Sequence, residues 1–373
     1  MRARIPAVTG YGAELTAAWA AHTAPREPDA PTVASLFAGC GGSSLGYSMA
    51  GFRELLAVER DPHAVAMFRR NFPDVAVYHG DVTELDPAAL PLAPGELDVL
   101  DGSPPCQGFS RAGKFTARDT RNDLFRHFVR LLSAWQPRMF VMENVADMIR
   151  TRMRVRFAEV LAALRTAGPG YRVTARVLDS SWLRVPQSRS RMIFIGVRSD
   201  LDAEPTHPTP VSRPLTVRHA WADLDNPGLI VRPTGKFVAL APMIGPGENG
   251  AKALRAAGRK PAQFNLYRLS WHRPAPALPS LFGTSWAGFL HPAEDRFIGS
   301  REMTRLQSFP DEYDWGDSAY KLIHARVGNS VPPLMMRAVA TAVRSTLDQT
   351  RTGPVVGQGG APCPAPRPHA PAG

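Results

Sequence analysis

The sequence predicts an α/β protein with a mostly parallel sheet, because short apolar strands and amphipathic helices alternate from residue 31 onward. The predicted strands are TVASLF (32–37), ELLAVE (54–59), LDVLDGSPP (97–105), RMFVMEN (138–144) and RMIFIGV (191–197). Helices are expected between them, at residues 43–52, 62–72, 122–135 and 157–168. Residues 205–300 lack this alternation and are dense in proline, glycine and tryptophan. A second, smaller domain of irregular structure is therefore expected.

The remaining segments complete the expected domain organisation. Residues 31–204 form the main α/β domain, and residues 301–349 return to it through an amphipathic helix at 334–347. The two ends, residues 1–30 and 350–373, are rich in alanine, proline and glycine, so both are expected to be largely disordered. Within the first of them, AELTAAWAAH is compatible with a short helix.

Positive charge is concentrated in the middle of the chain. The net charge is +11, but residues 31–110 carry 4 Lys/Arg against 10 Asp/Glu, whereas residues 111–200 carry 18 against 7. This segregation favours a polyanion bound along the basic segment and leaves the acidic half for a different ligand. An arginine-rich surface without a partner is the alternative explanation.

The cysteines and the hydropathy pattern bear on the cellular compartment in which the protein is expected. Cys40, Cys106 and Cys363 form no CxxC pair, and their odd number argues against a secreted disulfide framework. No metal site is predicted. No apolar run approaches the ~20 residues that span a bilayer, and the first residues lack the apolar core of a signal peptide. A cytoplasmic protein without a membrane partner is expected.

A glycine-rich turn, FAGCGGSSLG (37–46), follows the first strand and opens a helix. Gly39, Gly41 and Gly42 allow a sharp turn and close approach to a nucleotide-like cofactor, although neither a P-loop nor the full GxGxxG pattern is present. Glu59 ends the next strand about 20 residues later, where an acidic residue pairs with ribose hydroxyls. Asp81, after a third strand, is a candidate acceptor for an adenine amine or a helix N-cap. Together they indicate an adenosine-type site.

Eight motifs, in order, resemble those of the DNA cytosine-5 methyltransferases, prokaryotic members above all. They span residues 35–333 and are LFAGCGG, VERDPHA, GDV, GSPPCQGFS, ENV, QSRSR, REMTRLQSFP and GNSVPP. The resemblance implies a Rossmann-like S-adenosylmethionine-dependent methyltransferase domain, with a target-recognition domain in residues 205–300. It also implies methyl transfer to carbon 5 of a flipped-out cytosine in a specific sequence of double-stranded DNA.

The same resemblance implies roles for catalytic residues. Cys106 matches the cysteine that adds to carbon 6 of the base, and the arginines after it favour its thiolate; a buried, unreactive cysteine is the alternative. Glu143 matches the carboxylate that hydrogen-bonds or protonates ring nitrogen 3 and holds the exocyclic amine. Arg189 and Arg191 match arginines near the flipped base, with Arg191 the stronger candidate for the cytosine carbonyl. Their alternate spacing predicts that both point to one site.

Further residues follow from the motif positions. The implied cofactor contacts are Phe37, Gly39, Gly41, Gly42, Glu59, Asp81, Val82, Pro105, Asn329 and Ser330. The implied DNA contacts, in a loop that closes over the base, are Gln107, Ser110, Arg111 and Lys114. Three positions depart from the family pattern: Ser35 replaces a frequent acidic residue, Arg60 follows Glu59 where an apolar or aromatic neighbour is common, and ARVGNS replaces the more usual isoleucine-glycine version.

Three other functions compete with DNA methylation. An RNA (tRNA) methyltransferase shares these motifs, but the CFT signature that resembles that branch is absent from the sequence. A non-catalytic DNA-binding regulator is expected to have lost Cys106, Glu143 or the glycine turn, and a cysteine hydrolase needs a histidine motif to activate the thiol. We expect a monomer that acts on DNA in the nucleoid, with a cognate restriction endonuclease as a possible separate partner.

Overall fold

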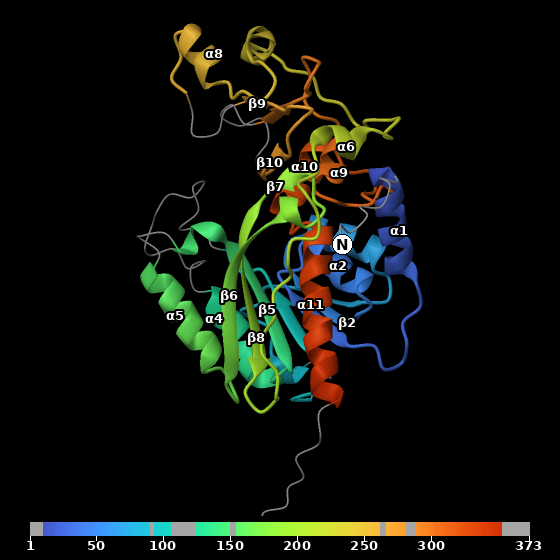
Figure 1. Ribbon diagram of the computed structural model, residues 1–373, viewed down its shortest axis with the longest axis vertical. Helices are drawn as coiled ribbons and strands as arrows, with labels where there is room; N and C mark the ends of the chain where they lie inside the picture. The colour runs from blue at the N-terminus through green and yellow to red at the C-terminus, as the bar shows by residue number, and fades with distance from the viewer. Residues whose placement is uncertain are drawn as a thin grey trace, which may run out of the picture.

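The computed structural model describes residues 10–89, 93–105, 124–149, 154–261, 266–280 and 288–352. A seven-stranded sheet in the order β3-β2-β1-β4-β5-β8-β6 forms its centre (Figure 1). The strands are β1 (Thr32–Leu36), β2 (Arg53–Glu59), β3 (Ala76–His79), β4 (Val99–Gly102), β5 (Met139–Val145), β6 (Tyr171–Asp179) and β8 (Ser190–Arg198). Strands β1 to β5 pair in parallel, and β8 runs antiparallel to both β5 and β6. The predicted mostly parallel sheet is confirmed.

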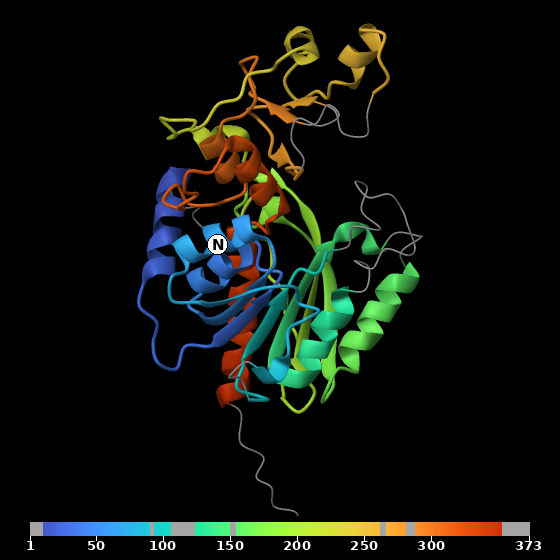
Figure 2. The same ribbon diagram turned by 180° about the vertical axis from the view of Figure 1, so that it is seen from behind.

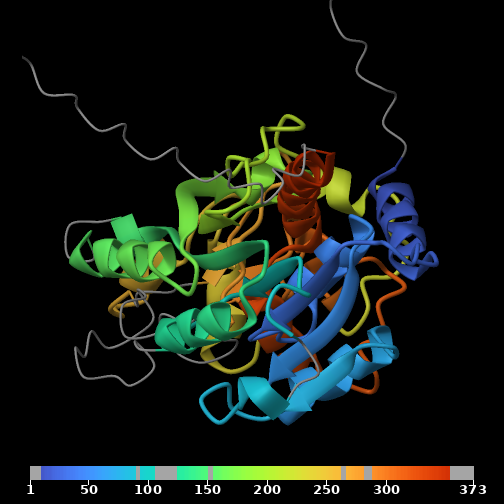
Figure 3. The same cartoon turned by 90° about the horizontal axis from the view of Figure 1, so that it is seen from below.

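Helices cover both faces of this sheet because successive strand residues point to opposite sides. Val33 of β1 packs in the core beneath α2 (Gly42–Met49), α3 (Pro62–Asn71) and α11 (Pro333–Thr352), whereas its neighbour Ala34 packs in the core beneath α4 (Leu124–Trp135) and α5 (Arg154–Arg165). Figure 3 shows the green helices α4 and α5 on one side of the sheet and the red α11 on the other. The strands β1, β4 and β5 are therefore buried from both sides.

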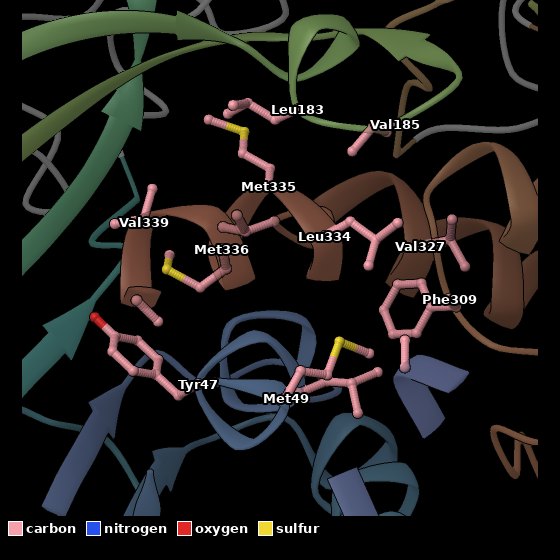
Figure 4. Close-up of a cluster of buried hydrophobic side chains, with 14 of the residues drawn as sticks. Tyr47, Met49, Leu183, Val185, Phe309, Val327, Leu334, Met335, Met336 and Val339 are labelled. Carbon is pink, nitrogen blue, oxygen red and sulfur yellow. The ribbon is translucent and has the colours of Figure 1, made fainter. Parts of the chain in front are cut away.

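The last helix, α11, packs along α2 in the centre of one of these cores. Met335, Met336 and Val339 of α11 lie between Tyr47 and Met49 on one side and Leu183 and Val185 on the other (Figure 4). Gly46 of α2 permits the contact, because a Cβ at this position would lie 2.6 Å from Cβ of Met336. The return of the chain to the α/β domain thus follows from apolar spacing on α11 and a small residue on α2.

The N-terminal segment differs from the expectation of a largely disordered extension. Residues Tyr11–Thr23 form helix α1, which buries Tyr11, Leu15 and Ala18 against the main domain. These residues recur at intervals of four and three, the spacing of one helix face. The short helix that AELTAAWAAH allows is therefore present, and the expectation of disorder was wrong for residues 11–23 because it rested on the alanine-rich composition alone. At the other end, α11 continues to Thr352, and the predicted tail beyond it lies outside the described residues.

Residues 205–300 form a smaller part beside the carboxyl ends of the strands, seen from behind in Figure 2. Its elements are α6 (Val217–Trp221), α7 (Lys236–Leu240), α8 (Ala251–Ala256), β9 (Leu266–Arg268), β10 (Ala275–Pro276) and β11 (Gly288–Leu290). A small core of its own includes Leu240, Ile244 and Phe297. Strand β10 pairs with β7 (Gln187–Ser188), and α9 (Ser300–Leu306) and α10 (Tyr320–Asn329) lead back to the main domain.

Arg268 organises this smaller part from inside. Its buried guanidinium donates to the carbonyls of Ala241, Ile244, His291 and Glu294 and pairs with Asp295. We expect Arg268→Met to lower the free energy of unfolding by about 3 kcal/mol or more, because four carbonyls lose their donor. Urea denaturation followed by tryptophan fluorescence measures this change. Arg255→Met, on the exposed side of α8, is the matched control, and an equal effect of both would contradict the role of Arg268.

No helix among the residues that the structure describes is long and apolar enough to cross a bilayer.

Candidate active site

The carboxyl ends of the parallel strands bring the predicted site residues to one edge of the sheet. Phe37 follows β1, and Glu59 ends β2. Pro105 lies three residues after β4, and Glu143 lies two residues before the end of β5. Open α/β sheets bind ligands at this edge, where loops from neighbouring strands meet. The arrangement follows from the parallel register rather than from local sequence.

The glycine-rich turn is fitted tightly between two other segments, one at Phe72 and one at Val331. Gly41 has φ +90°, and a Cβ there would lie 2.4 Å from the ring of Phe72. A Cβ on Gly42 would lie 2.3 Å from the carbonyl oxygen of Val331. Gly39 is different: it also has a positive φ, but a Cβ at this position would have no atom within 4 Å. Two glycines are therefore needed for packing, and the third leaves open space at the edge of the sheet.

Glu59 faces this open position with its carboxylate held by three backbone donors. Oε2 accepts from the amide of Gly39 at 2.8 Å, and Oε1 accepts from the amides of Arg60 and Asp61 at 2.9 and 2.8 Å. A fixed carboxylate beside an unfilled glycine suits the ribose hydroxyls of an adenosine, which need acceptors of defined direction. The residues present thus fit the adenosine end of S-adenosylmethionine.

Asp81 lies at the start of a turn after β3 and next to the buried Val82. Its Oδ1 accepts from the amide of Thr83 at 3.0 Å, and its Oδ2 lies 3.1 Å from Nη1 of Arg60. The hydrogen bond from Thr83, followed by the Arg60 contact, lowers the pKa of Asp81, so its carboxylate stays ionised as an acceptor. Asp81 caps a turn rather than an α-helix, and the unexpected Arg60 is the side chain that holds it.

The GNSVPP segment closes the other side of the glycine turn. Asn329 ends α10 and is exposed, whereas Ser330 is buried. The hydroxyl of Ser330 lies 3.1 Å from Sγ of Cys40 and donates to the carbonyl of Arg326 at 2.8 Å. Burial raises the pKa of Cys40 to about 11, so this thiol remains neutral and acts as a packing group of the turn.

Glu143 and Arg191 form an ion pair across the adjacent strands β5 and β8. Nε of Arg191 lies 2.8 Å from Oε1 of Glu143, and the two side chains are 17% and 11% exposed. A contact so short and so sheltered from water fixes the directions of both groups. Next to it, Asn144 donates to the carbonyl of Pro104 at 3.2 Å, which ties β5 to the segment that leads to residue 106.

Arg189 makes its hydrogen bonds to other partners than this pair. It lies between β7 and β8, where its buried guanidinium donates to the carbonyls of Leu278 at 3.3 Å and Gly328 at 2.9 Å. Burial, together with the charge of Arg191, lowers the pKa of Arg189. Arg189 thus has hydrogen-bond partners of its own while the charges of Arg191 and Glu143 both act on it, and the expectation that the two arginines serve one site stays a prediction.

Five predicted residues fall outside the described part of the chain. These are Cys106, Gln107, Ser110, Arg111 and Lys114. Pro105, half-buried, is the last described residue before them.

Sequence reasoning missed two sets of polar residues around the site. Asp101 of β4 is buried and accepts from the hydroxyl of Tyr47 at 3.4 Å; burial, with the charges of Glu54 and Glu143, raises its pKa. An acidic residue in an otherwise apolar strand was a visible signal for it. Gln187 donates to the Gln307 side chain at 2.5 Å, and Gln307 donates to the carbonyl of Ser330 at 2.6 Å. Both glutamines lie within quoted motifs, but only their three-dimensional contact reveals the link.

Comparison with known proteins places this arrangement in a family. The model of the C-5 cytosine-specific DNA methylases matches residues 32–345. The type II methyltransferase M1.HphI of Haemophilus parahaemolyticus is 33% identical over 344 residues, covering 84% of this chain and 86% of that protein. M.DdeI of Desulfomicrobium norvegicum is 30% identical over 368 residues, covering 83% and 88%.

Solved structures agree with this assignment. A putative DNA modification methyltransferase encoded within an Escherichia coli prophage matches with a TM-score of 0.64 and 25% identity, covering 86% of this chain and all of that one. DNMT2 of Spodoptera frugiperda, 18% identical with a TM-score of 0.59 over 84% of this chain and all of that one, supports the fold alone. The chain belongs to the C-5 cytosine-specific DNA methylase family and is an enzyme that transfers methyl groups from S-adenosylmethionine to carbon 5 of cytosine in DNA.

Proposed function

We propose that the thiolate of Cys106 is the nucleophile of this reaction. Its sulfur adds to carbon 6 of the cytosine, and the electron pair of the 5,6 double bond makes carbon 5 nucleophilic enough to take the methyl group. S-adenosylmethionine supplies the electrophilic methyl and leaves as S-adenosylhomocysteine. Loss of the proton on carbon 5 then expels the Cys106 sulfur and restores the ring. The position of Cys106 in GSPPCQGFS and the arginines that follow it support this role.

The Glu143–Arg191 pair is proposed to bind the flipped-out cytosine. Negative charge develops on the ring when sulfur adds to carbon 6, and groups preorganised at ring nitrogen 3 and the carbonyl stabilise it. The Glu143 carboxyl is proposed to hydrogen-bond nitrogen 3 and the exocyclic amine, and the Arg191 guanidinium the carbonyl. Their 2.8 Å contact, buried beside the Pro104 segment, is the observation that supports this most. Arg189, held by Leu278 and Gly328, is proposed to position the link between the strands.

The cofactor is proposed to lie over the glycine turn. Glu59 binds the ribose, Asp81 and Val82 bind the adenine, and Phe37 packs against it. The remaining contacts come from the backbone at Gly39, Gly41 and Gly42 and from Pro105, Asn329 and Ser330. The open position at Gly39 and the fixed carboxylate of Glu59 support this placement.

The DNA is proposed to lie between the strand ends and residues 205–300, which select the target sequence. Gln107, Ser110, Arg111 and Lys114 are the proposed contacts of a loop that closes over the flipped base. The excess of 18 Lys/Arg over 7 Asp/Glu in residues 111–200 supports a polyanion there. We propose that the enzyme acts as a monomer on double-stranded DNA. The name type II methyltransferase of its relatives supports a cognate restriction endonuclease as a separate partner.

Bisulfite sequencing of DNA from cells that express the protein tests this function. We expect 5-methylcytosine at one position of a single short sequence wherever that sequence occurs, because base contacts by residues 205–300 select it. Purified protein should also bind the matching duplex with an affinity that falls about tenfold or more between 50 and 200 mM salt. Methyl label found in RNA but not in DNA would contradict the proposal, and so would an affinity for DNA that does not change with salt.

A further inference from the structure

Helix α1 lies outside the part of the chain that matches the family. The family model begins at residue 32, whereas α1 spans Tyr11–Thr23. The helix is nevertheless attached to the main domain by buried apolar residues and by several polar contacts. It packs against α2 and α6, so it lies behind the glycine-rich turn that α2 continues. The contacts of α1 therefore raise the question of what this helix does for the glycine-rich turn.

The first route from α1 to the turn passes through Tyr313. The ring of Trp19 meets the ring of Tyr313 edge-on, with centroids 6.4 Å apart and planes at 73°. The buried hydroxyl of Tyr313 donates a hydrogen bond to the carbonyl of Cys40, the central residue of the turn. Tyr313 thus supplies a donor to the turn backbone, and its ring is held by Trp19 together with Phe309 and Trp315, whose ring centroids lie 5.0 and 4.6 Å away.

The second route passes through Phe72. The ring of His22 meets that of Phe72 edge-on at 5.0 Å, and its nitrogens are bonded to the hydroxyl of Ser48 at 2.7 Å and the carbonyl of Asn71 at 3.0 Å. Phe72 is the ring that a Cβ on Gly41 would strike at 2.4 Å. The back of the turn therefore rests on Phe72, and α1 holds Phe72 through His22.

Other contacts of α1 anchor it away from the turn. Glu14 pairs with Arg184, which adopts φ +65°, a left-handed conformation that is unfavourable for arginine. Gly12 donates to Asp223 at 2.9 Å, and the hydroxyl of Tyr11 donates to the carbonyl of Arg184 at 3.2 Å. The helix is fixed at one end by these contacts and braces the turn with the other.

We propose that α1 is part of the S-adenosylmethionine site, in which Trp19 and Tyr313 are positioning residues that hold the backbone of the glycine-rich turn in its cofactor-binding conformation. The proposal rests on the placement of the cofactor over this turn. Loss of these contacts should weaken cofactor binding while leaving DNA binding unchanged, because Trp19 and Tyr313 lead to Cys40, whereas α1 meets residues 205–300 elsewhere, through Gly12 and Asp223.

The test is the affinity of the full-length protein for S-adenosylhomocysteine, measured by titration calorimetry. We expect Tyr313→Phe to raise the Kd about five- to tenfold, since it removes the hydroxyl that donates to Cys40 and keeps the ring. Trp19→Ala should raise the Kd about threefold. In kinetics both variants should raise KM for S-adenosylmethionine and change kcat less than about twofold.

Tyr11→Phe is the matched control for Tyr313→Phe. It also removes a buried hydroxyl that donates to a backbone carbonyl, but at Arg184 rather than in the turn. Equal Kd values for Tyr11→Phe and Tyr313→Phe would overturn the proposal, as would equal losses of cofactor and DNA affinity in Trp19→Ala. Glu59→Ala separates the two levels of inference. If it leaves the Kd unchanged, the placement of the cofactor is wrong; if it weakens binding while Tyr313→Phe and Trp19→Ala do not, only the brace is wrong.

Discussion

Cys106→Ser is expected to abolish methyl transfer while leaving affinity for DNA and S-adenosylmethionine within about twofold of the original. A serine hydroxyl is almost never ionised at neutral pH, so it cannot add to carbon 6 as a thiolate does, and the rate should fall by a factor on the order of 10⁴ or more. Transfer of a labelled methyl group to duplex DNA measures the rate. Gel-shift and calorimetric titrations measure the two affinities.

The chain offers a matched control for this substitution. Cys363 lies beyond residue 345, where the match to the family ends, and Cys363→Ser should retain full activity. Methyl transfer by Cys106→Ser at more than about one per cent of the original rate would contradict the covalent mechanism. Loss of activity in Cys363→Ser would show that the effect of serine is not specific to the proposed nucleophile.

Glu143→Gln has the second largest expected effect, a fall in kcat of about 10²- to 10⁴-fold. The amide keeps the size of the side chain but removes the acid, so the charge that develops at ring nitrogen 3 loses its partner. It also turns the ion pair with Arg191, whose Nε lies 2.8 Å from Oε1 of Glu143, into a hydrogen bond to a neutral acceptor. Single-turnover methylation with saturating DNA and cofactor isolates this step from binding.

Two further variants show whether the effect belongs to the reaction. Glu159 of α5 is an acid paired with Arg156 and Arg126 on the surface, and Glu159→Gln should leave kcat within about twofold. Arg191→Lys keeps the charge but loses the planar guanidinium, so its kcat should lie between those of the original protein and Glu143→Gln. If Glu143→Gln lowers only the thermal stability and leaves kcat normal, the Glu143–Arg191 pair supports the fold and takes no part in the reaction.

The sequence predicts the sheet well where strands are buried from both faces. The mostly apolar strands β1 and β5 are visible without any structure, and so is the turn that follows β1. Strand β6 was missed because it lies at the edge of the sheet, where exposed positions interrupt the apolar pattern. For helix α1 the sequence indicates only a short helix in an otherwise disordered segment, because three apolar residues among alanines form a weak signal.

The motifs predict which residues belong to the site, but they do not predict which side chains and carbonyls those residues contact. Glu59 and Glu143 lie at strand ends as expected, since a parallel sheet brings such ends together. The partners of Arg189, by contrast, are carbonyls of Leu278 and Gly328, which are 89 and 139 residues away in sequence. The donor that Tyr313 supplies to Cys40 is equally remote. Long-range contacts of this kind leave no local pattern.

The central claim, that Cys106 adds to the base, is tested most directly by trapping the adduct. A duplex that carries 5-fluorocytosine at the target position should form it with S-adenosylmethionine, because fluorine cannot leave carbon 5 as a proton does and the sulfur is then not expelled. Denaturing electrophoresis and mass spectrometry of the digested complex should find the DNA bound covalently to the peptide that contains Cys106, and no complex with Cys106→Ser. Methylation of the normal duplex without any trapped complex, or attachment at another residue, would contradict the account.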